Sequence, residues 1–170
     1  MDSLGKIVSF LLVSIILFVA PVYYMSIKQD SISQNYVNKE TADFVNTIRN
    51  TGNITTETYN RFIKKIDTTG NLYDIEIEHQ YLVVNPVVDE NGNVTEDIRS
   101  SYSSTYEDDI LKELFEGSGT YHMNKDDYVS VIVKNKNKTL ATRIQEIFYQ
   151  KEMPTVQIIS TFGGIIRDET

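Results

Sequence analysis

Residues 7–25 read IVSFLLVSIILFVAPVYYM, a run of nineteen residues without a charge. As a helix that rises about 1.5 Å per residue, this run is about 28 Å long, close to the hydrocarbon thickness of a bilayer. We predict an uncleaved membrane-spanning helix. A secretory signal peptide is the alternative, but no small-x-small cleavage site follows the apolar run. The predicted anchor residues are Ile7, Phe10, Leu11, Leu12, Ile15, Ile16, Leu17, Phe18, Pro21, Tyr23 and Tyr24.

The charges that flank this run give little guide to its orientation. Lys6 stands opposite Asp2 on one side, and Lys28 stands near Asp30 on the other, so the positive-inside count is almost a tie. The segment before the run is very short, and residues 26–170 carry the whole net charge of -8. We therefore expect a single-pass protein of the cell membrane, with a cytoplasmic N-terminus and an extracellular C-terminal head.

The composition excludes several classes of chemistry. The chain has 170 residues, of which 41% are hydrophobic, enough for one ordinary domain besides the anchor. Its net charge is negative and is repelled by phosphate groups, which argues against nucleic acid as a partner. The absence of cysteine removes disulfides, thiolate zinc sites, iron–sulfur clusters and cysteine nucleophiles.

The apolar run continues into a long stalk. No Pro or Gly interrupts residues 26–51, and Gly52 follows as a helix stop. We predict one helix over about 4–50, with a short tail and span at 1–25 and a stalk at 26–50 that belongs to the head, 26–170. The stalk packing face follows the spacing of one helix face. It comprises Val37, Thr41, Phe44, Val45 and Ile48.

The remaining chain predicts an α+β head. Thr55 caps a short helix, residues 72–84 alternate as a half-buried strand, and residues 85–106 are polar and are predicted to be mostly loop. A helix at 107–116, a strand at 128–133, a helix at 139–149 and a strand at 155–161 follow. We expect Leu140, Ile144, Ile147 and Phe148 to be buried. The order favours a small antiparallel sheet of about three strands, with two to three further helices on one face.

No residue is predicted to be catalytic, cofactor-binding or metal-ligating. His79 lies at a core-facing strand position and is interpreted as a hydrogen-bonded structural histidine. Asp89-x-Asn91-x-Asn93 resembles the opening of a calcium loop, but an EF-hand needs glycine at its sixth position and glutamate at its twelfth, where this chain has valine and serine. A hairpin or loose loop is favoured there, with weak calcium binding as the alternative. The basic cluster at 134–138 is interpreted as a solvated turn, with contact to a lipid headgroup or a partner as the alternative.

Three stretches carry a family resemblance. They are ADFVNTIRNTGNITTETYNRFIKKIDTTGNLYDIEIEH at 42–79, MNKDDYVSVIVKNKNKT at 123–139 and PTVQIISTFGGIIRDE at 154–169. The chain resembles TadE-like, type IV pilin-related membrane proteins of Gram-positive bacteria in its pattern helix–TGxIT–helix–TGxxYDI. This resemblance implies an exported head on a membrane helix, and pilin-like or assembly-platform subunits of a Tad-like pilus or secretion apparatus as partners. It implies no catalytic residues and no cofactor.

The chain departs from the pilin pattern at its N-terminus. Pilin precursors have a glycine cleavage site followed by an apolar stretch with glutamate at its fifth position, whereas here Gly5 and Lys6, the candidate processing site, are followed by Phe10 at that position. We therefore expect a non-enzymatic minor pilin or pseudopilin-like component. The alternative is a bitopic sensor or ligand-binding module with a closed pocket lined by tyrosines and carboxylates.

Overall fold

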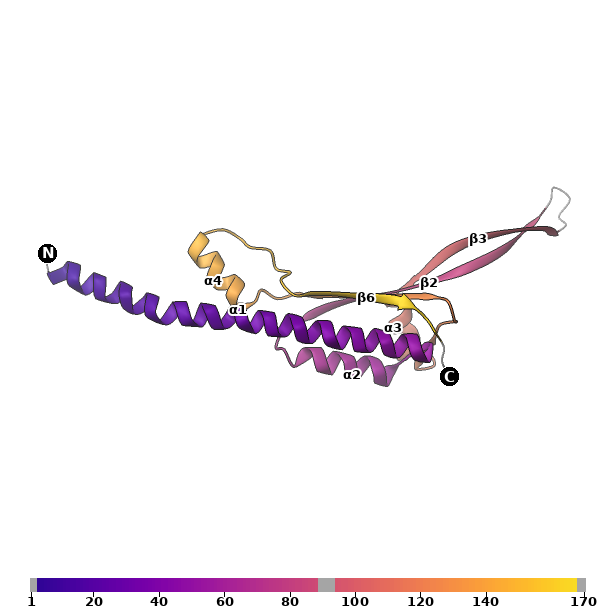
Figure 1. Cartoon of the computed structure of the whole chain (residues 1–170), viewed down its shortest axis with the longest axis horizontal. Helices are drawn as coiled ribbons and strands as arrows, with labels where there is room; N and C mark the ends of the chain where they lie inside the picture. Colours follow the sequence, from indigo (N-terminus) through magenta and orange to yellow (C-terminus); the bar gives the residue numbers. More distant parts are fainter. Residues whose placement is uncertain (1–2, 89–93, 168–170) are drawn as a thin grey trace.

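A single long helix organises the molecule (Figure 1). The computed structural model describes residues 3–88 and 94–167, and the side chains of these except 86–88 and 94–99. Helix α1 runs without interruption over Ser3–Thr51 and continues through Pro21. Its 49 residues make it about 73 Å long. The predicted continuous helix is confirmed.

The end of α1 is fixed by local signals in the sequence. Gly52 adopts a φ of 64°, in the left-handed region that favours glycine, and its amide donates to the carbonyl of Ile48 at 2.8 Å. Strand β1 (Asn53–Thr55) and helix α2 (Thr56–Asp67) follow. Thr55 and Thr58 exchange side-chain-to-backbone hydrogen bonds of 3.1 and 3.0 Å, a reciprocal cap that starts α2.

The main sheet has four antiparallel strands in the order β3-β2-β5-β6. They are β2 (Tyr73–Val88), β3 (Val94–Tyr106), β5 (Tyr128–Asn135) and β6 (Ile159–Ile165). A second, two-stranded sheet pairs β1 with β4 (Thr120–His122). The α+β class is therefore confirmed, with more strands than the three expected.

The prediction of a loop over 85–106 was wrong. Strand β2 extends to Val88 and pairs with β3 from Tyr106 back to Val94. β5 pairs with β2 only as far as Gln80, so among the described residues no third strand lies beside the outer part of the β2–β3 hairpin. Its polar sequence lacks the alternation that marks a half-buried strand.

The core lies between the inner face of the sheet and three helices. α1, α2 and α3 (Glu107–Glu116) lie on one side of the sheet (Figure 1). Val129, Val131 and Val133 of β5 point inward and are fully buried, and alternate residues of β2 join them. Burial of this continuous apolar surface supplies the main stabilisation of the head.

Helix α4 (Leu140–Tyr149) departs from the prediction. Its period is as expected, but Leu140, Ile147 and Phe148 are exposed, and only Ala141 and Thr142 of this helix are buried. The expected burial was therefore wrong for Leu140, Ile147 and Phe148, whereas Ile144 is half-buried. α1, α2 and α3 already cover the inner face of the sheet, and α4 packs on α1 beyond the end of the strands (Figure 1).

Gly164 lets β6 come close to α1. A Cβ placed on Gly164 would lie 2.5 Å from Nε of Arg49, and that nitrogen donates to the carbonyl of Ile165 at 3.0 Å. Gly164 thus leaves the space that the Arg49 side chain occupies. Removal of this space would push the sheet edge away from the stalk.

Candidate functional site

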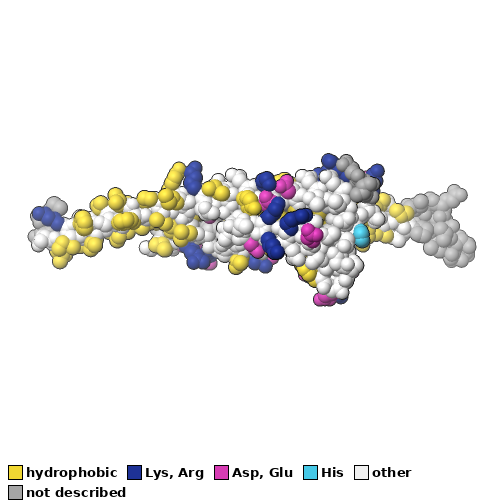
Figure 2. Space-filling model, turned by 90° about the horizontal axis from the view of Figure 1, so that it is seen from below, with side chains coloured by type: hydrophobic (Ala, Val, Ile, Leu, Met, Phe, Trp, Pro, Cys, Tyr) yellow, Lys and Arg dark blue, Asp and Glu magenta, His cyan; other side chains and the backbone are white. Residues whose placement is uncertain are grey.

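The N-terminal half of α1 is an exposed apolar rod. It is the one helix within the described part of the chain that is long and apolar enough to cross a membrane, and none of that stretch is buried (Figure 2). A core helix of a soluble protein would be largely covered by its own fold. This helix therefore fits a single-pass membrane protein.

The predicted anchor residues are not equivalent in their surroundings. Ile7, Phe10, Leu11, Leu12, Ile15, Ile16, Leu17, Phe18, Pro21 and Tyr24 are all exposed. Tyr23 is half-buried, and its hydroxyl accepts a hydrogen bond of 2.8 Å from the side-chain amide of Gln145 in α4. The ring of Tyr24 lies 5.6 Å from Nζ of Lys28, so the end of the rod combines aromatic and cationic groups. The candidate processing residues, Gly5 and Lys6, lie exposed in the first turns of α1.

The five stalk residues Val37, Thr41, Phe44, Val45 and Ile48 are all buried against the head. The Phe44 ring stacks on Phe62 of α2, with centroids 4.4 Å apart and planes 1° from parallel. The second half of α1 is thus part of the core of the head, and not only a spacer.

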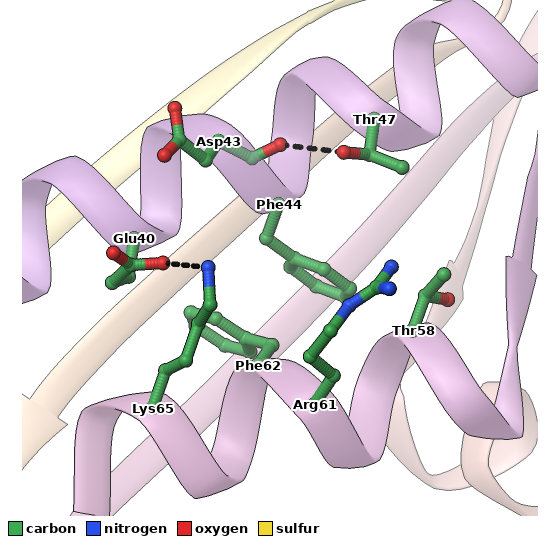
Figure 3. A pocket seen from close by; sticks show the side chains of 8 residues that line it. All are labelled: Glu40, Asp43, Phe44, Thr47, Thr58, Arg61, Phe62 and Lys65. Atoms are coloured by element: carbon green, nitrogen blue, oxygen red, sulfur yellow. Dashed lines mark hydrogen bonds and ion pairs between the residues drawn. The ribbon is translucent and has the colours of Figure 1, made fainter. Parts of the chain in front are cut away.

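A shallow hollow of about 290 Å³ separates α1 from α2 next to this stack (Figure 3). Arg61 and Lys65 rise from α2 toward α1, and Nζ of Lys65 lies 2.6 Å from the Glu40 carboxylate. Burial would raise the pKa of Glu40, but hydrogen bonds from Lys65 and Lys39 outweigh it and leave the pKa below its ordinary value. The hollow holds an internally satisfied ion pair.

A second hollow, the tyrosine–acid cleft, has a volume of about 330 Å³ and opens between α2, β2 and α3. Burial raises the pKa of Tyr59 to about 12, with a further contribution from the nearby Glu107. Burial also raises the pKa of Glu107, and the like charges of Asp74 and Asp108 raise it further. The cleft is lined by Tyr59, Asn60, Ile63, Ile66, Asp67, Tyr73, Asp74, Ile75, Glu107 and Lys136.

His79 forms a buried network that the sequence only half predicted. Its Nε2 lies 2.9 Å from Oδ2 of Asp127, and its Nδ1 lies 2.9 Å from the hydroxyl of Tyr121. The same carboxylate oxygen accepts the amide of Asn124 at 2.7 Å. His79 and Asp127 are both buried, so the network ties β2 to β4 and to the turn before β5.

The lysines of the 134–138 cluster are paired within the head. Lys134 contacts Glu76 at 2.6 Å, Lys136 contacts Asp74 at 2.8 Å, and Lys138 contacts Glu146 at 2.6 Å. Neighbouring acids therefore balance their charge. The suggested calcium loop, at Asp89, Asn91 and Asn93, lies outside the described residues. Among the described residues, no group of three or more His, Asp or Glu side chains could hold a metal ion.

The outer part of the β2–β3 hairpin forms an arm, residues 81–88 and 94–103. It projects past the C-terminal end of α1, away from the N-terminus (Figure 1). Leu82, Val84 and Tyr102 are exposed on it. Exposed apolar side chains on a projecting hairpin are typical of a contact surface. The two ends of the molecule thus present different surfaces, an apolar rod at one end and a hairpin arm at the other.

Comparisons with known proteins find no matching family model, no matching curated protein and no matching solved structure. The functional assignment therefore rests on the geometry.

Proposed function

We propose that this chain is a non-enzymatic, membrane-anchored structural component of a Tad-like pilus or secretion apparatus, similar in role to a minor pilin or pseudopilin. The N-terminus lies in the cytoplasm and the head lies outside the cell. One observation carries the proposal: the C-terminal half of α1, which packs on the head, and the exposed apolar rod at its N-terminal half form one unbroken helix.

This continuity supports a structural role for the anchor. A flexible linker would let a head turn freely relative to the membrane, whereas an unbroken helix sets its distance and direction. The Phe44–Phe62 stack and the buried Ile48 fix the head to the same helix. Any force or contact on the head is therefore transmitted to the span, as assembly of membrane subunits into a larger structure requires.

The uncharged span supports an accessory role. It lacks the acid that in pilins neutralises the amino terminus of the neighbouring subunit, so its association with other spans would depend on packing and weak polar contacts. The hairpin arm, at the opposite end, is the surface most available to a partner outside the cell.

The tyrosine–acid cleft favours a second candidate function, that of a bitopic sensor. Its tyrosines and carboxylates suit a small cationic ligand, and it is open to solvent rather than closed. A sensor would function as separate chains or dimers, whereas an assembly component would form oligomers larger than a dimer.

The experiment combines processing, topology and assembly in native membranes. Because the chain has no cysteine, single-cysteine variants report unambiguous positions. Intact mass and N-terminal sequencing establish whether Gly5–Lys6 is cut. Tyr102→Cys should react with a membrane-impermeant maleimide on whole cells, and reaction only after permeabilisation would contradict the orientation.

Cross-linking then tests assembly. Ile32→Cys, exposed on α1 just beyond the span, should give a ladder of products larger than a dimer with a bismaleimide. Asn50→Cys, exposed at the far end of the same helix, is the matched control and should give fewer products. Monomer alone at both positions would reject the assembly role and leave the sensor.

A further inference from the structure

Helix α4 presents its apolar stripe to the outside. Leu140, Ile147 and Phe148 are 56%, 75% and 64% exposed. Together with Ile144, which is half-buried, they fall within an arc of about 100°, as expected for one face of an amphipathic helix with 3.6 residues per turn. An apolar stripe of this kind is stable in water only if something covers it.

Two hydrogen bonds place α4 at the level of the end of the apolar rod. The hydroxyl of Thr139 donates to the Asp30 carboxylate at 2.7 Å, and the side-chain amide of Gln145 donates to the Tyr23 hydroxyl at 2.8 Å. From Asp30 back to Tyr23, α1 rises about 10 Å, and from Thr139 to Gln145 the chain of α4 rises about 9 Å. α4 therefore leans back toward the N-terminus of α1 and is inclined away from it, on the rod side of the sheet (Figure 1).

This placement is held by specific contacts. Nζ of Lys138 lies 2.6 Å from the Glu146 carboxylate, and the same Oε1 atom accepts the amide of Met153 at 2.8 Å. The Thr139 side chain accepts the amide of Thr142 and so caps the start of the helix. Both ends of α4 and the chain that leaves it are tied to the head, so the exposed stripe is a fixed feature.

A lipid surface is the occupant that best fits this stripe. The exposed apolar surface continues from α4 onto Val22 and Met25 at the end of the span. A bilayer that reaches the end of the span therefore also reaches the last turns of α4. Residues 138–152 contain three bases and two acids, in a chain of net charge -8, so the region around α4 lacks the acidity that would repel anionic lipid.

We propose that α4 is an interfacial helix whose apolar stripe lies in the leaflet on the side of the head. It gives the head a second membrane contact and fixes its rotation about α1, as an amphipathic helix in the headgroup–acyl boundary would. This inference rests on the proposed membrane anchor.

The test is spin labelling of single-cysteine variants of the full chain in vesicles of phosphatidylcholine with a minority of phosphatidylglycerol. Oxygen concentrates in lipid and a nickel chelate stays in water, so the two collision rates report the surroundings of the label. Ile147→Cys probes the stripe, and Arg143→Cys, an exposed polar position of the same helix at the border of the stripe, is the matched control. Phe18→Cys marks the span, and Tyr102→Cys marks the hairpin arm.

We expect collisions with oxygen to dominate at Ile147→Cys and Phe18→Cys, and collisions with nickel to dominate at Arg143→Cys and Tyr102→Cys. Domination by nickel at Ile147→Cys, with oxygen still dominant at Phe18→Cys, would overturn the interfacial helix and leave the anchor. Nickel dominance at both would overturn the anchor as well. Protection of Ile147→Cys from both reagents would show a protein surface on the stripe and overturn lipid as the occupant.

Discussion

The most direct test of the stalk's place in the core is the substitution Phe44→Ala. Phe44 is 5% exposed, stacks on Phe62 with centroids 4.4 Å apart, and meets the edge of Tyr59 at 6.4 Å. Truncation of a buried phenylalanine costs about 3–5 kcal/mol, and each aromatic pair adds about 0.5–1.5 kcal/mol. The ring borders the open hollow between α1 and α2, so water can enter the space that it leaves. We therefore expect a loss at the lower end, about 3 kcal/mol.

The matched control is Phe10→Ala, the same change on the same helix at a residue that is 73% exposed. It should change the free energy of unfolding of the head by less than about 0.5 kcal/mol. Urea unfolding of the full chain in non-ionic detergent, followed by tyrosine near-ultraviolet circular dichroism, measures both. The signal is available because the chain has 11 tyrosines and no tryptophan. For Phe44→Ala the loss corresponds to a fall in melting temperature of about 10 °C.

A loss below about 1 kcal/mol for Phe44→Ala would refute the reasoning, since no well-packed buried phenylalanine is so cheaply removed. Equal losses for the two variants would also refute it. In that case α1 would stabilise the protein only as a membrane helix, and its second half would not form part of the core of the head.

Two further substitutions test polar groups in the head by the same urea assay. Glu40→Gln should cost about 1–3 kcal/mol at neutral pH, because it removes a charged hydrogen bond to Lys65. The pKa of Glu40 in the folded protein is lowered, so the contribution of its carboxylate is present above its ordinary pKa of 4.5 and is lost as pH falls through the lower folded value. The two proteins should converge in strong acid, and a constant gap would contradict this ion pair. Asn135→Ala should cost at least about 3 kcal/mol, because its buried amide makes four hydrogen bonds of 2.7–2.9 Å to backbone groups between 137 and 158. Unchanged hydrogen exchange at the Ile158 amide in this variant would contradict that role.

The elements that the sequence predicted well are those with local signals. Gly52 ends α1, and the Thr55–Thr58 cap starts α2. The alternation in β2 correctly placed Ile77 and His79 on the inner face. Each of these depends on residues a few positions apart, so no knowledge of the distant chain was needed.

The elements that the sequence missed depend on distant partners. β3 contains a run of serines and threonines without apolar alternation, and only its pairing with β2 makes it a strand. The carboxylate of Asp127 bonds His79, which lies 48 residues away. The register of β2 with β5 pairs His79 with Val129 and so brings the two side chains together. Neither the register of the strands nor their order in the sheet can be deduced from the spacing of two residues along the sequence.

The error at α4 has a different origin, because the periodicity itself was correct. Spacing determines which residues share a face, but it does not determine what covers that face. In a soluble domain the protein core is the only apolar phase available, whereas a chain with a membrane span has two. Here α1, α2 and α3 lie on one side of the four-stranded sheet, and α4 packs on α1 rather than on the sheet. The stripe on α4, held beside the end of the span by Gln145 and Tyr23, then has lipid as its nearest apolar surroundings.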